Sequence, residues 1–321
     1  MLKDTEYAFA VAKIRANENN LIKASALDSA IVAETFKDAI KIFVDAGFSE
    51  LDEYDVDTAL SYRMRRAFNL IYDAAPDKKC LDFLIVKNDF HNLKALLKGL
   101  VANVDTGNFL LLPTVNDVDT LKKAVNEKKF DLLSPVFRIA VKEAYDVLTE
   151  TLDGQSCEAI LDRACLETSV LLAKDLGDEF AIKFCERLAL LTNFKICLRA
   201  IKTGKDEKFY KSAVADVCDK QKLIDKALDG IESFKEYVSF CGYGDLAEAV
   251  DVSYAAFEKL IDDRMLECVN NAKFTSFGIS PLVAYYFASD SETKNVRIVL
   301  SCKKNGISSE IIRERVRKLY V

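Results

Sequence analysis

The acidic run Asp262-Asp263-Arg264-Met265-Leu266-Glu267 contains the residues whose types and spacing could most directly do chemistry. Carboxylates on one helix face could hold Mg²⁺ against a diphosphate, because this ion prefers oxygen ligands and binds phosphate oxygens. Such a site needs a partner motif, and Asn116-Asp117-Val118-Asp119-Thr120 continues to Ala124 where a glutamate is required. A solvated charged helix face is therefore favoured, and an all-helical magnesium-dependent diphosphate-processing enzyme stays as the alternative.

Two other motifs could belong to a catalytic or cofactor site. A Ser–His–Asp triad would have to use His91, the only histidine, which we interpret as a partly solvated helix residue. The stretch Gly242-Tyr243-Gly244-Asp245-Leu246-Ala247 fits the dinucleotide pattern G-x-G-x-x-A and follows a strand-like segment, Tyr237 to Cys241. That fold also needs a second strand ending in an acid, whereas Asp262 sits in a helical pattern. We therefore expect no catalytic residues, no cofactor and no metal site.

The composition predicts a folded, helix-rich protein. Of 321 residues, 50% are apolar and 30% are charged, as in globular domains, and 11 glycines and four prolines leave few tight turns. The net charge of -6 has the wrong sign for neutralising phosphates, so no nucleic-acid partner is expected. Nine cysteines without a C-x-x-C pair indicate reduced thiols in a cytoplasmic protein. The first residues lack a signal-peptide pattern, and no apolar run reaches the ~20 residues of a membrane span.

Internal repetition is the most informative feature of the chain. Asn92-Leu93-Lys94-Ala95-Leu96-Leu97-Lys98 recurs as Asn193-Phe194-Lys195-Ile196-Cys197-Leu198-Arg199 and as Asn295-Val296-Arg297-Ile298-Val299-Leu300-Ser301. The three asparagines are 101 and 102 residues apart, so the period fills the chain. Each copy runs into a glycine that would suit a left-handed residue closing a helix, namely Gly99, Gly204 and Gly306. An apolar–Asp pair upstream opens another helical pattern in each copy: Val56-Asp57, Leu161-Asp162 and Val250-Asp251.

The repeat and the helix signals together predict the architecture. Ser134-Pro135 and Ser280-Pro281 each indicate a capping serine followed by proline at the start of a helix. We predict an all-α fold with three similar helical-bundle domains, at residues 1–105, 106–210 and 211–321. The period is too long for the common helix-pair solenoids.

Three stretches resemble the C subunit of prokaryotic V-type (A-type) ATPases and ATP synthases, whose eukaryotic counterpart is the d subunit of the vacuolar proton pump. They are Tyr7-Ala8-Phe9-Ala10-Val11-Ala12-Lys13-Ile14-Arg15-Ala16-Asn17-Glu18, Phe277-Gly278-Ile279-Ser280-Pro281-Leu282-Val283-Ala284-Tyr285-Tyr286, and Lys294 to Leu300 followed by Ile311 to Val321. The likeness covers essentially the whole length, although Ile279-Ser280 departs from the proline and acidic residues usual in the family.

The resemblance implies a non-catalytic rotor component. It implies three similar domains around a pseudo-threefold axis, forming a funnel that sits on the cytoplasmic face of the proteolipid ring. The funnel would receive the foot of the central stalk, formed by the D and F subunits, and would couple it to ATP-linked proton or sodium transport. We therefore expect a cytoplasmic, peripheral protein without direct membrane insertion, and a stand-alone helical scaffold is a further alternative.

The C-terminal segment is the candidate partner-binding region. Residues 294–321 carry eight basic and two acidic side chains, a charge of +6, and the rest of the chain carries the opposite sign. Ile312, Val316 and Leu319, at i, i+4 and i+7, predict one buried face of a last helix.

Arg313 and Arg317 would share an adjoining stripe of that helix. A helix docked on the third domain with a solvated arginine face is the ordinary interpretation. The functional hypothesis is that Arg313, Arg317 and Lys318 contact acidic residues of a partner. At the other end of the chain, Tyr7, Val11 and Ile14 predict an apolar helix face that packs within the protein.

Overall fold

Sixteen α-helices and five short 3-10 helices form the regular structure between residues 3 and 321, the part of the chain that the computed structural model describes. That part contains no strand, so the predicted all-α class is confirmed. Contacts divide the chain into two compact units: unit one is Met1–Lys78 with Tyr243–Val321, and unit two is Lys79–Gly242. These divisions fall elsewhere than after residues 105 and 210, and the three-domain pseudo-threefold funnel stays a prediction.

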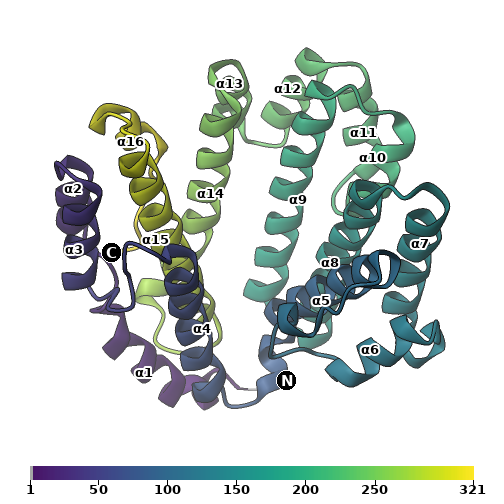
Figure 1. Cartoon of the computed structure of the whole chain (residues 1–321), viewed down its shortest axis with the longest axis horizontal. Coiled ribbons are helices and arrows are strands. Elements are labelled where there is room, and N and C mark those ends of the chain that lie inside the picture. Colours follow the sequence, from purple (N-terminus) through teal and green to yellow (C-terminus); the bar gives the residue numbers. More distant parts are fainter. Residues whose placement is uncertain (1–2) are drawn as a thin grey trace. The chain divides into compact units, whose positions relative to one another are not determined.

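Unit one is built around its longest helix, α15 (Ser280–Lys304), which packs along α1, α3, α4 and α14 (Figure 1). The other elements of the unit are η1 (Asp4–Tyr7), α1 (Ala8–Glu18), α2 (Ala24–Val32), α3 (Phe36–Asp45), α4 (Val56–Ala74), α13 (Gly244–Val252), α14 (Tyr254–Asn270), η5 (Asn271–Phe274) and α16 (Ser309–Arg315). Val296 and Val299 of α15 share one apolar core with Phe43 of α3 and Leu60 of α4. Helices from both ends of the sequence therefore bury their apolar faces together.

The first helix behaves as its pattern predicts. Val11 and Ile14 of α1 are buried within unit one, and so is Tyr7, the last residue of η1 and the N-cap of α1, so the expected burial of these apolar residues is confirmed. Arg15 extends beside that face and donates from Nη2 to the backbone carbonyls of Ala272 and Thr275. The N-terminal helix is thereby tied to the connection that leads into α15.

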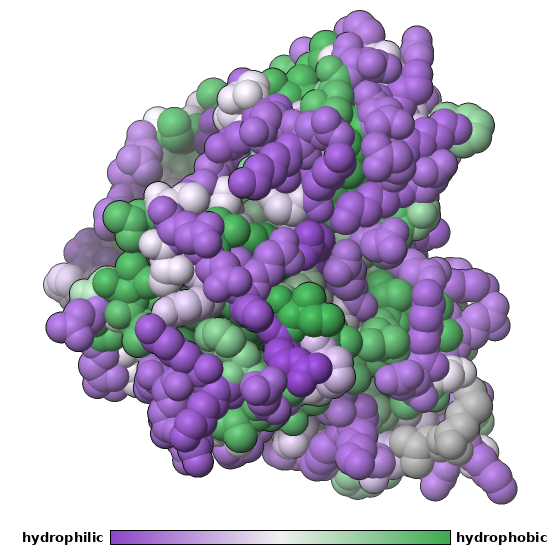
Figure 2. Space-filling view, turned by 90° about the vertical axis from the view of Figure 1, so that its right-hand side faces the viewer, coloured by the Kyte–Doolittle hydropathy of each residue, from purple (hydrophilic) through white to green (hydrophobic). Residues whose placement is uncertain are grey.

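In unit two, α8 (Gly154–Leu176) packs against α5, α7, α9 and α10. The other elements are η2 (Lys78–Leu81), which straddles the division, α5 (Asp82–Ala102), η3 (Gly107–Phe109), α6 (Val118–Asn126), η4 (Phe130–Leu132), α7 (Pro135–Thr151), α9 (Glu179–Lys202), α10 (Glu207–Ala213), α11 (Lys220–Leu228) and α12 (Ile231–Phe240). Figure 2 views the side that carries α7, α10 and α11, where hydrophilic side chains predominate and apolar ones form separate patches. None of the described helices has the length and hydropathy needed to cross a bilayer.

Helix starts follow local signals only in part. Ser134 is the N-cap of α7 and Pro135 its first residue, as predicted. Ser280-Pro281 also begins α15, but Ser280 is the first helical residue and Ile279 is the N-cap, so the predicted capping position is wrong there; neither serine makes a capping hydrogen bond. Val56-Asp57 opens α4, but Leu161-Asp162 lies inside α8 and Val250-Asp251 lies near the end of α13, so two of the three predicted starts are wrong. Those starts are set by upstream residues instead, with Asp153 accepting the first backbone N–H groups of α8.

The two chemistry-bearing motifs have structural explanations. His91 is exposed on α5, with Nε2 3.2 Å from the carbonyl oxygen of Phe109, as interpreted from the sequence. The segment Tyr237 to Cys241 is not a strand: it belongs to α12 and its C-cap, because Tyr237 and Val238 bury one helical face. Gly242 then adopts a φ of +89° between two helices. The dinucleotide pattern therefore lies in a helix–helix connection and lacks the strand it requires.

Candidate interaction surface

The C-terminal tail departs from the predicted helix. Helix α16 ends at Arg315, and Val316 already has extended backbone angles, φ -68° and ψ 145°. Residues 316–321 are not helical. The prediction of one helix through Leu319 is therefore wrong, and Arg313 and Arg317 do not share a helical stripe.

Side chains from α14 and α15 explain why the helix stops. Asn295 Nδ2 donates to the carbonyl oxygen of Arg317 at 3.0 Å, and Arg317 N donates to Asn295 Oδ1 at 2.7 Å. Lys318 N donates to Asp263 Oδ1 at 2.7 Å, and Ser291 Oγ donates to the carbonyl oxygen of Lys318 at 2.9 Å. These bonds satisfy backbone groups that would otherwise form the hydrogen bonds of a longer helix. Continuing the helix would therefore add no hydrogen bonds to the tail.

Arg313 is the predicted site residue that remains on a helix. Its Nη1 lies 2.5 Å from Asp28 Oδ1 of α2, and its side chain is 50% exposed. An exposed pair of this kind contributes little to stability, because water and salt screen it. Replacing Asp28 as the partner of this guanidinium would therefore cost the fold little.

Arg317 and Lys318 are placed differently from each other. Arg317 Nε lies 3.0 Å from Asp262 Oδ2, and its side chain is only 16% exposed. Lys318 Nζ lies 2.7 Å from Glu267 Oε1, and its side chain is 59% exposed. The hydrogen bond from Lys318 lowers the pKa of Glu267, and the same bond raises the pKa of Lys318. Of these two residues, Lys318 is the more exposed to solvent.

The acidic run on α14 is occupied by groups of the chain itself. Asp262 accepts hydrogen bonds from Lys294 Nζ and Arg317 Nε, and Asp263 accepts the backbone N–H of Lys318. Burial acts to raise the pKa of Asp262, but the two cations outweigh it and the pKa is lowered. Burial raises the pKa of Asp263, which is almost fully enclosed.

The carboxylate oxygens of Asp262 and Asp263 already accept hydrogen bonds from Lys294, Arg317 and the backbone of Lys318. They are therefore not arranged to bind one metal ion together. Within residues 3–321, no group of three or more acidic, histidine or cysteine side chains is arranged to hold a metal ion. The geometry thus gives no support to the diphosphate-enzyme alternative, which needs several carboxylates facing one ion.

The positive charge of residues 294–321 is largely matched inside unit one. Five of its eight basic side chains pair with carboxylates outside the segment: Lys294 with Asp262 and Asp290, Arg297 with Asp57, Arg313 with Asp28, Arg317 with Asp262, and Lys318 with Glu267. The segment is therefore less electropositive at its surface than its composition indicates.

The asparagine contact with the tail occurs three times in the molecule. Asn92, Asn193 and Asn295 are each fully buried on a long helix, and each side chain both donates to and accepts from the backbone of one residue further along the chain. Those residues are Leu111, at 2.9 and 2.7 Å, Ala215, at 2.9 Å in both bonds, and Arg317, at 3.0 and 2.7 Å. We call these contacts the three asparagine clamps. They give the sequence repeat a common structural role.

A left-handed residue follows each clamp asparagine by the same interval. Asn103, Gly204 and Gly306, each 11 residues on, have φ values of 54°, 61° and 66°. Gly204 and Gly306 therefore close their helices as predicted, but Gly99 does not. It lies inside α5, where a Cβ atom would collide with Thr106 Cγ2 and come within 2.8 Å of the Val104 carbonyl oxygen. In the first copy the left-handed position is filled by asparagine, the side chain that tolerates it best after glycine.

Sequence reasoning found the asparagines as a repeat but missed what they do. It also missed Ser291 and the structural use of Asp263, both of which bind the tail. The recurrence of a polar residue at a position flanked by apolar ones was the available signal, because a buried amide must find hydrogen-bond partners.

The helices and their clamps define the class of this chain: an all-helical protein in which three long helices hold the segment that follows them in the same way. The chain belongs to the ATP synthase (C/AC39) subunit family, whose sequence pattern matches residues 10–315. It is 23% identical to the C subunit of the V-type sodium ATPase of Enterococcus hirae over 272 residues, which cover 83% of each chain. It is 24% identical to the C subunit of the A-type ATP synthase of Methanocaldococcus jannaschii, covering 96% of this chain and 85% of that protein.

Proposed function

We propose that this chain is the non-catalytic rotor component that couples the central stalk to the membrane ring in a V-type or A-type rotary ATPase. In this role it sits on the cytoplasmic face of the proteolipid ring and receives the foot of the stalk, formed by the D and F subunits. The observation that carries the proposal is the family match over residues 10–315, together with relatives named as the C subunit of such enzymes.

The hydrogen bonds that fix the connections inside each unit support this role. A part that transmits torque must resist deformation, because an elastic part would let the stalk turn without turning the ring. Each asparagine clamp fixes the chain after a long helix by two hydrogen bonds inside the protein. Buried, fully bonded polar contacts of this kind select one arrangement, since every alternative leaves polar groups unpaired.

Arg313, Arg317 and Lys318 are the proposed contacts for acidic residues of the stalk or the ring. Arg313 and Lys318 present half-exposed cationic heads, whereas Arg317 is mostly buried and paired with Asp262, so it offers a partner the least surface of the three. Charge complementarity at such a surface would favour register and association rate more than bare affinity.

A reconstitution experiment tests the proposal directly. The full chain is mixed with the purified D–F stalk complex and, separately, with detergent-solubilised proteolipid ring, and binding is measured by pull-down and by light scattering. The coupling role predicts association with both. Association with neither would instead favour a stand-alone helical scaffold and would refute the proposal.

A further inference from the structure

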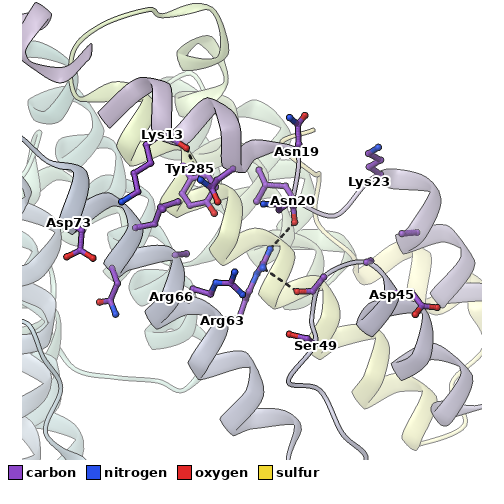
Figure 3. Close-up of a pocket in the computed structure, with 18 of the residues that line it drawn as sticks. Lys13, Asn19, Asn20, Lys23, Asp45, Ser49, Arg63, Arg66, Asp73 and Tyr285 are labelled. Carbon is purple, nitrogen blue, oxygen red and sulfur yellow. Dashed lines mark hydrogen bonds between the residues drawn. The ribbon is translucent and has the colours of Figure 1, made fainter. Parts of the chain in front are cut away.

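Unit one contains a cavity of about 810 Å³ that the proposed function does not use. It is bounded by the C-terminal half of α1, the connection from α1 to α2, the end of α3 and the middle of α4 (Figure 3). A volume of this size is ordinary for a site that binds a small molecule.

The floor of the cavity is a buried arginine. Arg63 is 7% exposed and lies with Nη2 2.9 Å from Glu292 Oε1. It donates to the carbonyl oxygens of Asn20 at 3.0 Å and Gly47 at 3.4 Å, the bonds drawn in Figure 3. The Gly47 bond is long and uses one of the two N–H groups on Nη1, so the guanidinium keeps a donor for a further acceptor.

Three more cations line the cavity. Among residues 3–321, no carboxylate lies within ion-pair distance of Lys13, Lys23 or Arg66. Lys13, Lys23 and Arg66 differ in this from the cations along α14 and α15, which pair with carboxylates, and Figure 3 sets Lys23 at one side of the pocket, away from Lys13 and Arg66. An anion bound between Lys13 and Arg66 would be attracted by both positive charges.

The acidic side chains of the cavity stand apart from its centre. Figure 3 places Asp73 and Asp45 at opposite ends, with Lys13, Arg66 and Asn20 between them. The part of the pocket between these two carboxylates therefore holds the cations of Lys13 and Arg66 together with Asn20, whose amide can donate hydrogen bonds.

We propose that this cavity binds a small phosphate-bearing anion, held between Lys13 and Arg66 over the buried Arg63. Phosphate suits the lining because its several oxygens can accept from donors on different sides, including a bidentate guanidinium and a lysine ammonium. The inference is independent of the proposed coupling role, since it concerns the isolated chain.

Calorimetric titration of the full chain with inorganic phosphate and with pyrophosphate, at constant ionic strength, tests the proposal. Binding of at least one of them is expected, with a rise in the unfolding temperature as the anion concentration increases. Arg66→Gln and Lys13→Gln should each weaken binding by about tenfold, because each removes a charge-assisted hydrogen bond.

Arg65→Gln is the matched control, since Arg65 is the exposed neighbour of Arg66 on α4 and does not line the cavity. It should leave the affinity unchanged. Circular dichroism of all three variants should match that of the unmodified chain. The proposal is overturned if neither anion binds, if chloride at equal ionic strength competes equally well, or if Arg65→Gln weakens binding as much as Arg66→Gln.

Discussion

Arg63 of α4 and Glu292 of α15 stand 229 residues apart in the sequence and form a buried ion pair, with Arg63 Nη2 2.9 Å from Glu292 Oε1. Glu292 Oε2 also accepts the backbone N–H of Ile22 at 2.8 Å. The pair therefore joins the first and last parts of unit one at one point. Removing this ion pair should therefore destabilise the whole of unit one.

Arg63→Met should lower the free energy of unfolding by about 3–5 kcal/mol at pH 8, because Glu292 is left buried without its cation. Burial already raises the pKa of Glu292, and removing Arg63 raises it further. The folded variant then holds a proton that the unfolded chain releases above about pH 4.3, so its stability falls as the pH rises.

Urea unfolding at pH 5 and pH 8 measures that slope. Lys122→Met, which breaks the exposed pair with Asp119, should cost less than about 1 kcal/mol and serves as the control. An equal effect of the two substitutions would contradict the structural importance of the buried pair.

Asn295→Ala should destabilise the protein by about 2–3 kcal/mol, since it deletes two hydrogen bonds and leaves a buried backbone group unpaired. Asn92→Ala and Asn193→Ala should behave alike if the clamps are equivalent. Hydrogen exchange of the Arg317 backbone amide should become faster in the Asn295→Ala variant. Asn305→Ala, at the exposed C-cap of α15 whose side chain donates only to the carbonyl oxygen of Ser301, should change stability by no more than about 0.5 kcal/mol.

Gly204→Ala should cost about 1 kcal/mol, because only the left-handed backbone opposes the methyl group and no atom lies within 4 Å of it. Gly99→Ala should cost more, since its Cβ would collide with the Val104 carbonyl oxygen. Asn103→Gly should be neutral or slightly stabilising. Thermal unfolding of the three variants checks the order, and an equal loss for Gly204 and Gly99 would contradict it.

Asp262→Asn should reduce stability at neutral pH and have little effect in acid. Although burial opposes it, Lys294 and Arg317 hold the pKa of Asp262 below its ordinary value. A carboxyl whose pKa is lowered on folding stabilises the protein above its unfolded pKa of about 3.9, and this contribution is lost as the pH falls through the folded pKa. Unfolding free energies of both proteins between pH 3 and pH 7 should therefore converge at the acid end; a constant difference would rule out this origin.

Arg313→Glu with Lys318→Glu should weaken assembly with the stalk or ring and make the remaining binding less sensitive to salt, because fewer charges then attract the partner. Both positions are half exposed, so the fold should persist. Arg138→Glu, which breaks an exposed pair with Asp131 on unit two, is the matched control. Unchanged binding to both partners would refute the proposed contacts.

The sequence predicted helices and a repeat well, because both leave local marks. The spacing of apolar residues placed Tyr7, Val11 and Ile14 on a buried face. The repeat interval singled out the three asparagines that form the clamps, although not the contacts they make. The tail was mispredicted because the spacing of Ile312, Val316 and Leu319 fits a helix.

What stops that helix is supplied from far away in the sequence, by Asp263 and Asn295. The division into two units was equally inaccessible, since it rests on contacts such as the one between Arg63 and Glu292. A local sequence pattern does not indicate which distant side chain will form a hydrogen bond with a given backbone group.

Unit one is assembled from both ends of the chain, whereas unit two is a single continuous stretch. During translation, the helices before residue 79 emerge long before the ribosome has made α15, on which their apolar faces depend. Unit two can thus complete its core before the N-terminal helices of unit one have their packing partner α15. The apolar faces of those N-terminal helices therefore stay accessible to chaperones until synthesis is nearly finished.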